Sequence, residues 1–210
     1  MIKIKKIYKN LYIIKSNSRK ELVMTILRFQ EYYESPKFKN KIFSLKDFIT
    51  WYRSVNNNKF TYVFDYCGFN FPSYVLKPFY KNKFKDITKN ERKVLDFFKN
   101  INGNFYIIAS VNNDITTLKH ELAHYFWRYN KAYKRKIKTI LNKIPNREIL
   151  KLKRVLKNED YHESIILDEI HAYLTIESSS HPILLTANIN INSEILKLLK
   201  LTFNKYYNKL

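Results

Sequence analysis

The chain of 210 residues contains very little cysteine, glycine and proline. Its one cysteine, Cys67, excludes an internal disulfide, so the fold is not a secreted cystine scaffold and we expect a reducing compartment. Two glycines and five prolines exclude a collagen-like or linker-like chain. Hydrophobic residues at 45% and aromatic residues at 16% instead indicate a folded protein with a core.

Long apolar runs are also missing. Between Met1 and Lys15 lysines break up the apolar residues, which leaves no unbroken apolar stretch long enough for a signal peptide or a membrane span. We therefore expect a soluble chain in the cytoplasm or elsewhere inside the cell, with no membrane partner. Because no change of composition marks a linker, we expect one domain over residues 1–210, with an N-terminal sub-region over 1–100 and the motif-bearing helices over 101–210.

Acidic residues are few beside basic ones, 18 against 39, and the formal net charge is +21. An excess of this size attracts polyanions, so possible non-specific nucleic-acid contact is one expected property. Of the 39 cations, 31 are lysine and they accompany abundant Asn, Ile, Tyr and Phe, a mixture that AT-rich codons also supply. The charge therefore predicts non-specific association with polyanions but indicates no catalytic activity. It leaves the oligomeric state open.

The N-terminal half indicates short strands and helices. The pattern predicts, in chain order, a hairpin over 2–13, a helix over 18–35, a helix over 44–54 and a strand over 60–66. Ser18 and Glu21 have the spacing of a capping box, and Ser35 with Pro36 ends the helix that follows. The segment 67–85 shows no period, and we expect an irregular connection with exposed aromatic side chains.

The C-terminal half indicates a strand followed by several helices. The pattern predicts a helix from Thr88 to Asn102, a strand over Phe105–Val111, a helix from near Ile115, two basic amphipathic helices between 132 and 156, a helix from about Glu159 to Glu177 and a last helix over 193–207. Ser178 to Pro182 reads as a break, with His181 as a loop residue. The fold class expected is α+β, mostly helical, with a small sheet before the helix that begins near Ile115.

His120 and His124 are four residues apart in that helix. Positions i and i+4 lie on one helix face, one turn apart, so two imidazoles can bind one ion. Glu121 projects about 100° from His120 around the helix, where it can reach water and act as a general base. The pattern predicts a Zn²⁺ site; the alternative is that two surface histidines and a glutamate only share a helix.

A catalytic zinc needs a third protein ligand and one open position. The helical face through Ile165, Ala172 and Ile176 is apolar except for Glu169, and a lone carboxylate on an inward face requires a partner. We therefore prefer Glu169 as third ligand, although a salt bridge to a lysine or a helix cap would also satisfy it. His171 is the rival ligand; it lies about 200° from Glu169 around the helix, so both cannot bind one ion.

Three neighbours of Glu169 complete the candidate site. Asp168 is placed to orient a histidine N–H, or else is a solvated charge. Tyr173 and His162 face the same side as Glu169 and are candidate donors to a developing oxyanion, with core or rim positions as the alternative.

The motif His120 to His124, followed by a glutamate on a later helix, resembles the gluzincin division of HExxH zinc metallopeptidases. The similarity covers roughly Phe105 to Glu177, and only the five-residue motif is specific. It implies a zincin-like fold in which zinc is bound by His120, His124 and Glu169, Glu121 activates water, and the strand Phe105–Val111 lines the substrate cleft. Thermolysin-like members carry an acidic residue where this chain has Tyr173.

The sequence therefore predicts a zinc-dependent metallopeptidase that hydrolyses peptide bonds in a protein or peptide substrate, with Glu121 as the base. We expect a substrate strand to pair with the edge of Phe105–Val111. The alternative is a basic nucleic-acid-binding or virion-type interaction protein with a structural or vestigial zinc site. A protease recruited to nucleoprotein by the lysine-rich helices between Lys131 and Lys157 would combine both.

Overall fold

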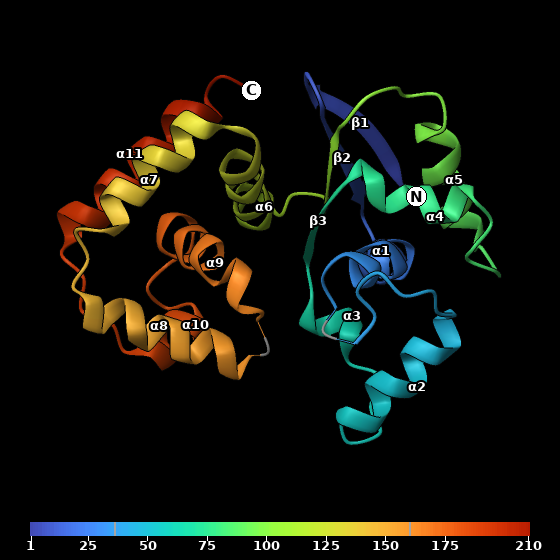
Figure 1. The fold of residues 1–210 in the computed structure, drawn as a ribbon, viewed down its shortest axis with the longest axis horizontal. Helices are drawn as coiled ribbons and strands as arrows, with labels where there is room; N and C mark the ends of the chain where they lie inside the picture. The colour runs from blue at the N-terminus through green and yellow to red at the C-terminus, as the bar shows by residue number, and fades with distance from the viewer. Residues whose placement is uncertain (36, 160) are drawn as a thin grey trace. The chain divides into compact units, whose positions relative to one another are not determined.

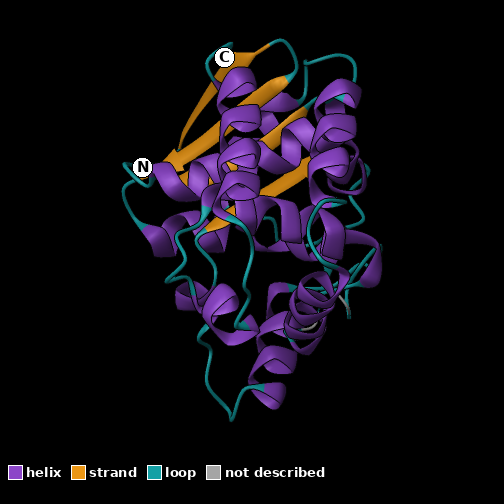
Figure 2. Cartoon of the chain, turned by 90° about the vertical axis from the view of Figure 1, so that its left-hand side faces the viewer, coloured by secondary structure: helices purple, strands orange, loops and turns teal. Residues whose placement is uncertain are grey.

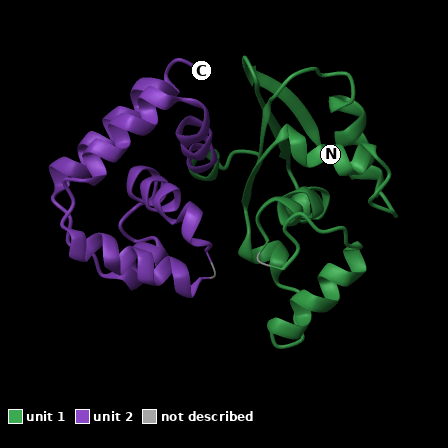
Figure 3. Cartoon of the chain, viewed as in Figure 1, with its two compact units in different colours: residues 1–118 green, residues 119–210 purple. Residues whose placement is uncertain are grey.

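The computed structural model describes residues 1–35, 37–159 and 161–210. These parts of the chain form a mostly helical α+β structure with a small sheet, which confirms the predicted class (Figure 1). The chain divides into two compact units, residues 1–118 and 119–210 (Figure 3). Among the described residues, no helix is both long enough and apolar enough to cross a membrane.

The sheet, whose strands are orange in Figure 2, belongs to the first unit. Strands β1 (Lys3–Tyr8) and β2 (Leu11–Ser16) form the predicted antiparallel hairpin, and β4 (Tyr106–Val111) is the predicted strand before the motif helix. β4 pairs in parallel with β2 on one side and antiparallel with β3 (Gly68–Pro72) on the other. The prediction that a substrate strand adds to the edge of this strand is therefore wrong, because both of its edges already carry a neighbouring strand.

Three helices of the first unit lie where the sequence predicts them: α1 (Arg19–Glu34), α2 (Leu45–Val55) and α5 (Lys89–Phe98). The capping box at the start of α5 is complete, whereas the one at α1 is half formed. Ser18 Oγ accepts the Glu21 N–H, but the Glu21 carboxylate accepts the hydroxyl of Ser16 at 2.6 Å instead of the Ser18 N–H. α1 ends before Ser35, and Pro36 lies outside the described residues.

The strand predicted over 60–66 is wrong, since the structure has a short helix there, α3 (Tyr62–Asp65). Arg19 donates to the backbone carbonyls of Phe64 and Tyr66 at 2.6 and 3.3 Å and so satisfies the end of this helical turn. Tyr62 is buried. The β-favouring side chains are thus used for burial, and tertiary contacts override local propensity.

The irregular connection predicted over 67–85 is also wrong. It contains β3, the 3₁₀ turn η1 (Ser73–Leu76) and α4 (Lys77–Tyr80). Phe69 and Phe71 on β3 are buried, whereas Tyr74 and Tyr80 are exposed, as predicted for the aromatic residues of this segment. A strand of five residues without alternation is stabilised here by pairing with β4, which is a long-range contact.

The core of the first unit lies between α1 and the sheet. α1 contacts β2, β3 and β4, and the apolar side chains at this contact are fully or almost fully buried: Ile14, Leu22, Ile26, Phe71, Ile107 and Ala109. One charged pair is buried with them, Arg28 with Glu91. Gly103, with φ of +86°, makes the predicted turn before β4, a conformation that favours glycine.

The second unit is made of helices: α7 (Lys131–Leu141), α8 (Asn146–Asn158), α9 (Glu163–Ile176), α10 (Pro182–Ala187) and α11 (Ser193–Tyr207), together with most of α6 (Ile115–Tyr129). α11 contacts α7 and α9, and α8 contacts α9 and α10. These contacts hold α9, which carries Glu169, inside the unit.

Two boundaries in this unit differ from the prediction. α9 begins at Glu163 and not near Glu159, because the Glu159 N–H donates to Val155 and so still belongs to the end of α8; Asp160 lies outside the described residues. The segment after Ser178 includes α10, which the sequence reading missed. His181 is the N-cap residue of α10, and Pro182 occupies its first turn, where proline is favoured.

Candidate metal centre

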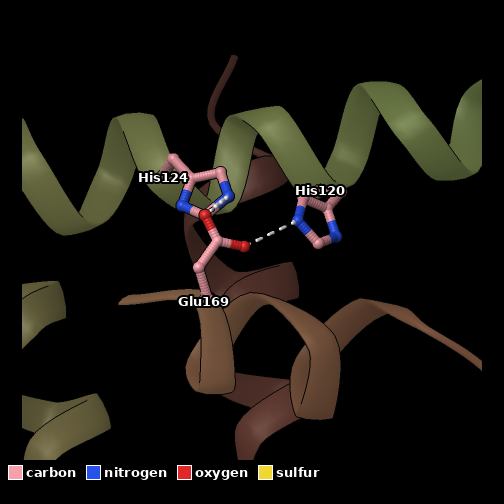
Figure 4. A group of neighbouring side chains, drawn as sticks. All are labelled: His120, His124 and Glu169. Atoms are coloured by element: carbon pink, nitrogen blue, oxygen red, sulfur yellow. Dashed lines mark ion pairs between the residues drawn. The ribbon is translucent and has the colours of Figure 1, made fainter. Parts of the chain in front are cut away.

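The two motif histidines come from α6. Asp114 accepts the Thr117 N–H at 3.0 Å and fixes the start of this helix. Leu122 and Ala123 are buried, and the same helix turn presents His120 and His124 side by side with their ring centroids 5.0 Å apart (Figure 4).

Glu169 reaches the same point from α9. Its Oε2 lies 3.7 Å from His120 Nε2, and its Oε1 lies 3.6 Å from His124 Nε2 (Figure 4). Ala172, at the next turn of α9, is fully buried. The structure thus gathers three of the predicted residues into a group that could hold a metal ion.

The other nitrogen of each histidine faces a second carboxylate. His124 Nδ1 lies 3.0 Å from Asp168 Oδ1, and His120 Nδ1 lies 3.0 Å from Glu177 Oε1. A hydrogen bond from Nδ1–H to a carboxylate is the arrangement that leaves Nε2 free to bind a metal. The sequence predicted this role for Asp168 but not for Glu177. The position of Glu177, eight residues and about two turns after Glu169, is the signal that could have found it.

These carboxylates control the charge of the histidines when no metal is bound. Burial alone would lower the pKa of His120, but hydrogen bonds to Glu169 and Glu177 raise it to about 9. Burial likewise opposes the charge of His124, and the charges of Asp168 and Glu169 outweigh this effect and raise the pKa of His124 well above 6.5. Protons thus compete with any metal for both Nε2 atoms.

His171 occupies a different place from Glu169. It is fully buried, its Nε2 lies 2.8 Å from the Tyr133 hydroxyl, and its Nδ1 faces the backbone carbonyl and the carboxylate of Asp168 at 3.0 and 3.3 Å. Burial lowers the pKa of His171, so the imidazole is neutral. Burial would raise the pKa of Asp168, but His124 and His171 lower it to about 2. Glu169 is therefore the residue that accompanies the two motif histidines.

The three donors lie close enough together to share a metal ion. Four ligands placed tetrahedrally at about 2.0–2.1 Å from a metal lie about 3.3–3.4 Å from one another. Glu169 Oε2 lies 3.7 Å from His120 Nε2 and Oε1 lies 3.6 Å from His124 Nε2, beyond ordinary hydrogen-bond length, and one ligand atom of each residue lies within 4.8 Å of the other two. His120, His124 and Glu169 keep only 13%, 7% and 12% of their side-chain surface exposed, so the donors are held in place but remain accessible.

Glu121 follows His120 on α6 and is buried, with 7% of its surface exposed. Its negative charge contributes to the raised pKa of both histidines, after the larger contributions given above. A carboxylate on the same helix turn as both imidazoles can hold or transfer a proton at the centre.

The two candidate oxyanion donors lie in different places. The Tyr173 ring packs at 5.0 Å from the His120 ring and at 4.9 Å from the ring of His181, and its hydroxyl is 3.1 Å from that of Tyr161. His162 is exposed at the N-cap of α9, where its Nδ1 accepts the Ser164 N–H at 3.3 Å. Tyr173 therefore borders the centre, and the hydrogen bonding of His162 is to the start of its own helix.

Comparison with known proteins adds no relative: no family model, no curated protein and no solved structure matches this chain.

Proposed function

We propose that this chain is a zinc-dependent metallopeptidase whose ion is held by His120, His124 and Glu169. The observation that carries the proposal is the convergence of both Nε2 atoms on the Glu169 carboxylate, at 3.7 and 3.6 Å, while each Nδ1 faces another carboxylate. Two imidazoles and one carboxylate are a donor set of catalytic zinc sites, which keep a fourth position open. The resemblance to zincin-like gluzincins rests on the same residues.

The protein's own residues supply the proton chemistry. A bound zinc ion lowers the pKa of water and polarises a carbonyl group. Glu121 takes the proton from the attacking water and returns it to the leaving amine. Tyr173, next to His120, is the candidate donor to the oxyanion, and the Tyr161 hydroxyl at 3.1 Å orients its O–H.

The experiment replaces the base alone. Glu121→Gln keeps the volume of the side chain but cannot accept the proton, so hydrolysis of an unfolded, fluorescently labelled protein should fall by a factor of about 10²–10⁴. Zinc content, measured by metal analysis of the purified chain, should stay at the wild-type level.

The matched control is Glu163→Gln on the exposed start of α9, where the side chain keeps 60% of its surface. This variant should cleave at the wild-type rate. Equal cleavage by Glu121→Gln and wild type would show that the base is wrong, and absence of zinc from the wild type after incubation with the metal would remove the whole proposal.

The alternative function is binding of nucleic acid through the exposed cations of α7 and α8. Their lysines and arginines lie on the solvated faces while Ile137, Leu152 and Leu156 are buried. A salt-dependent mobility shift with DNA or RNA that is insensitive to chelator and to Glu121→Gln would favour this alternative. The same faces also meet the ordinary requirement of an amphipathic helix, so the metallopeptidase proposal is preferred.

A further inference from the structure

A buried chain of hydrogen bonds leads away from the candidate centre through α9 to α7. His171 is enclosed by aromatic rings, since the Trp127 ring stacks on it at 5.1 Å and 15° and the Tyr133 ring meets it edge-on at 5.5 Å. Both His171 and Tyr133 are fully buried. Neither residue faces Glu169, and neither has a role in the function proposed above.

The direction of each hydrogen bond follows from its partners. The backbone carbonyl and the carboxylate of Asp168 only accept, so His171 carries its hydrogen on Nδ1. In the tautomer with its one hydrogen on Nδ1, His171 offers the Nε2 lone pair to the Tyr133 hydroxyl, which lies 2.8 Å away. In this tautomer the hydrogen bonds run from Tyr133 to His171 and from His171 to Asp168.

Asp168 ends this chain at His124. Its Oδ1 is 3.3 Å from His171 Nδ1 and 3.0 Å from His124 Nδ1, so one oxygen accepts from both rings. Asp168 keeps 21% of its side-chain surface exposed, and without an anchor its carboxylate would be free to turn toward water. The fully buried His171 supplies that anchor, and it ties α6, α7 and α9 together.

We propose that Tyr133 and His171 are positioning residues for the metal ligand His124 and act through Asp168. His171 fixes the Asp168 carboxylate, Asp168 keeps the His124 hydrogen on Nδ1, and the Nε2 lone pair of His124 then faces Glu169. Tyr133 in turn holds the His171 ring in the orientation that allows this. The inference rests on the proposed metal site and gives a role to His171, which the sequence presented as a rival ligand, and to Tyr133, which the sequence did not single out.

The test compares two substitutions of His171 in the full chain, with zinc affinity measured by chelator competition. In His171→Asn the amide nitrogen occupies about the position of Nδ1 and still donates to Asp168. In His171→Leu the donor is lost while more of the ring volume is kept. We expect zinc affinity within about threefold of wild type for His171→Asn and a loss of about 10–100-fold for His171→Leu, the range found for partners of metal ligands.

This order distinguishes positioning from packing. If His171 only filled space, the smaller asparagine would leave the larger cavity and would be the weaker binder. A result in which His171→Leu binds zinc as tightly as His171→Asn, or more tightly, overturns the inference.

Tyr133→Phe provides a second measurement that does not depend on the folding of the His171 variants. It removes only the hydroxyl, and we expect zinc to bind about three- to tenfold more weakly. Tyr206→Phe is the matched control, because the Tyr206 ring packs on Tyr133 at 5.1 Å and its hydroxyl takes no part in the chain; it should bind zinc like wild type. Wild-type affinity in Tyr133→Phe overturns the inference but leaves the proposed function standing, whereas a wild-type chain that binds no zinc overturns both.

Discussion

A buried group of charged side chains lies in each unit of the molecule, Arg28 with Glu91 in the first and two histidines with Glu169 in the second, and these two groups are built differently. In the first unit Arg28 donates from Nε and Nη2 to both oxygens of Glu91 at 2.7 and 2.6 Å, and both residues are 1% exposed. Further N–H groups of Arg28 donate to the backbone carbonyls of Lys85 and Asp86 at 3.0 and 3.2 Å. Each of these N–H donors has an acceptor at hydrogen-bond distance, and we call such a group closed.

In the second unit the corresponding distances are longer and the acceptors are in excess. Two imidazoles face the Glu169 carboxylate at 3.7 and 3.6 Å, while Asp168 and Glu177 take their Nδ1 atoms at 3.0 Å. A buried ion pair built for stability closes to hydrogen-bond length, as Arg28 and Glu91 do. The wider spacing with surplus negative charge is the arrangement that a bound cation would complete.

The largest effect should come from breaking the closed pair. Glu91→Ala leaves the Arg28 guanidinium buried without its partner and should lower the free energy of unfolding by about 3–5 kcal/mol. Urea unfolding of the wild type and of Glu91→Ala measures this loss of stability, and added zinc should leave the loss unchanged. The exposed pair of Lys157 and Glu163 is the control, since Glu163→Ala should change stability little. A small loss in Glu91→Ala would mean that the closed pair has no special role.

The second prediction concerns the group of histidines and carboxylates in the second unit. At zinc concentrations about a thousandfold above the dissociation constant, the wild type should gain about 4 kcal/mol of stability over the chelator-treated protein. His124→Ala removes one of the three donors and should lose this gain. Thermal unfolding of the wild type and of His124→Ala, each with zinc and with chelator, measures the gain in stability. An equal gain in the variant would show that zinc stabilises the protein through other residues.

A smaller effect is expected from Glu177, whose carboxylate faces His120 Nδ1. Glu177→Gln keeps an oxygen that can accept from Nδ1 but removes the negative charge. Zinc affinity should therefore fall by about 10–100-fold. Chelator competition gives the affinity, and Glu194→Gln on the exposed start of α11 is the control. Wild-type affinity in Glu177→Gln would exclude Glu177 from the metal centre.

The remaining prediction is a difference in pH dependence between the two groups. Without metal, the raised pKa values of His120 and His124 mean that folding takes up protons, so this contribution to stability is complete below the unfolded pKa of about 6.5 and is lost as pH rises toward about 9. Zinc affinity should change in the opposite sense and increase over the same range, because fewer protons must be displaced.

Two measurements between about pH 6.5 and pH 9 test this contrast: urea unfolding in the presence of chelator, and zinc titration. Urea unfolding of Glu91→Ala over the same pH range is the comparison. The penalty of Glu91→Ala should stay constant, because a guanidinium remains protonated throughout. Metal-free stability that is equal at both ends of the range would contradict the paired histidines and carboxylates seen here.

Local signals in the sequence predicted much of the fold. The helices with N-cap residues, such as α2 after Ser44 and α5 after Thr88, were found because capping and apolar period act within a few residues. The errors fell where distant contacts decide the structure. Tyr62–Asp65 has strand-forming residues but is helical, with Arg19 satisfying its last carbonyls, and Gly68–Pro72 becomes a strand only by pairing with β4.

The candidate site shows the same division. Helix spacing alone was enough to place His120, Glu121 and His124 on one turn, and the apolar face of α9 singled out Glu169. Glu177 at the end of α9, and Tyr133 at the start of α7, became neighbours of the centre only through the packing of helices. The spacing of about two helical turns from Glu169 offers a local signal for Glu177, whereas nothing near Tyr133 in the sequence indicates its contact with His171.

The sequence by itself determined which residues share a helix face, because the period of the α-helix fixes that geometry within one turn. The sequence favoured Glu169 over His171, but only the tertiary structure decided that Glu169 reaches the two histidines and that the Nδ1 atoms of His120, His124 and His171 face a carboxylate or a carbonyl. The reason is physical: which side of α9 faces α6 depends on the burial of Ile170, Ala172 and Leu174 against the other helices of the unit, a sum of many distant contacts that no short stretch of sequence contains.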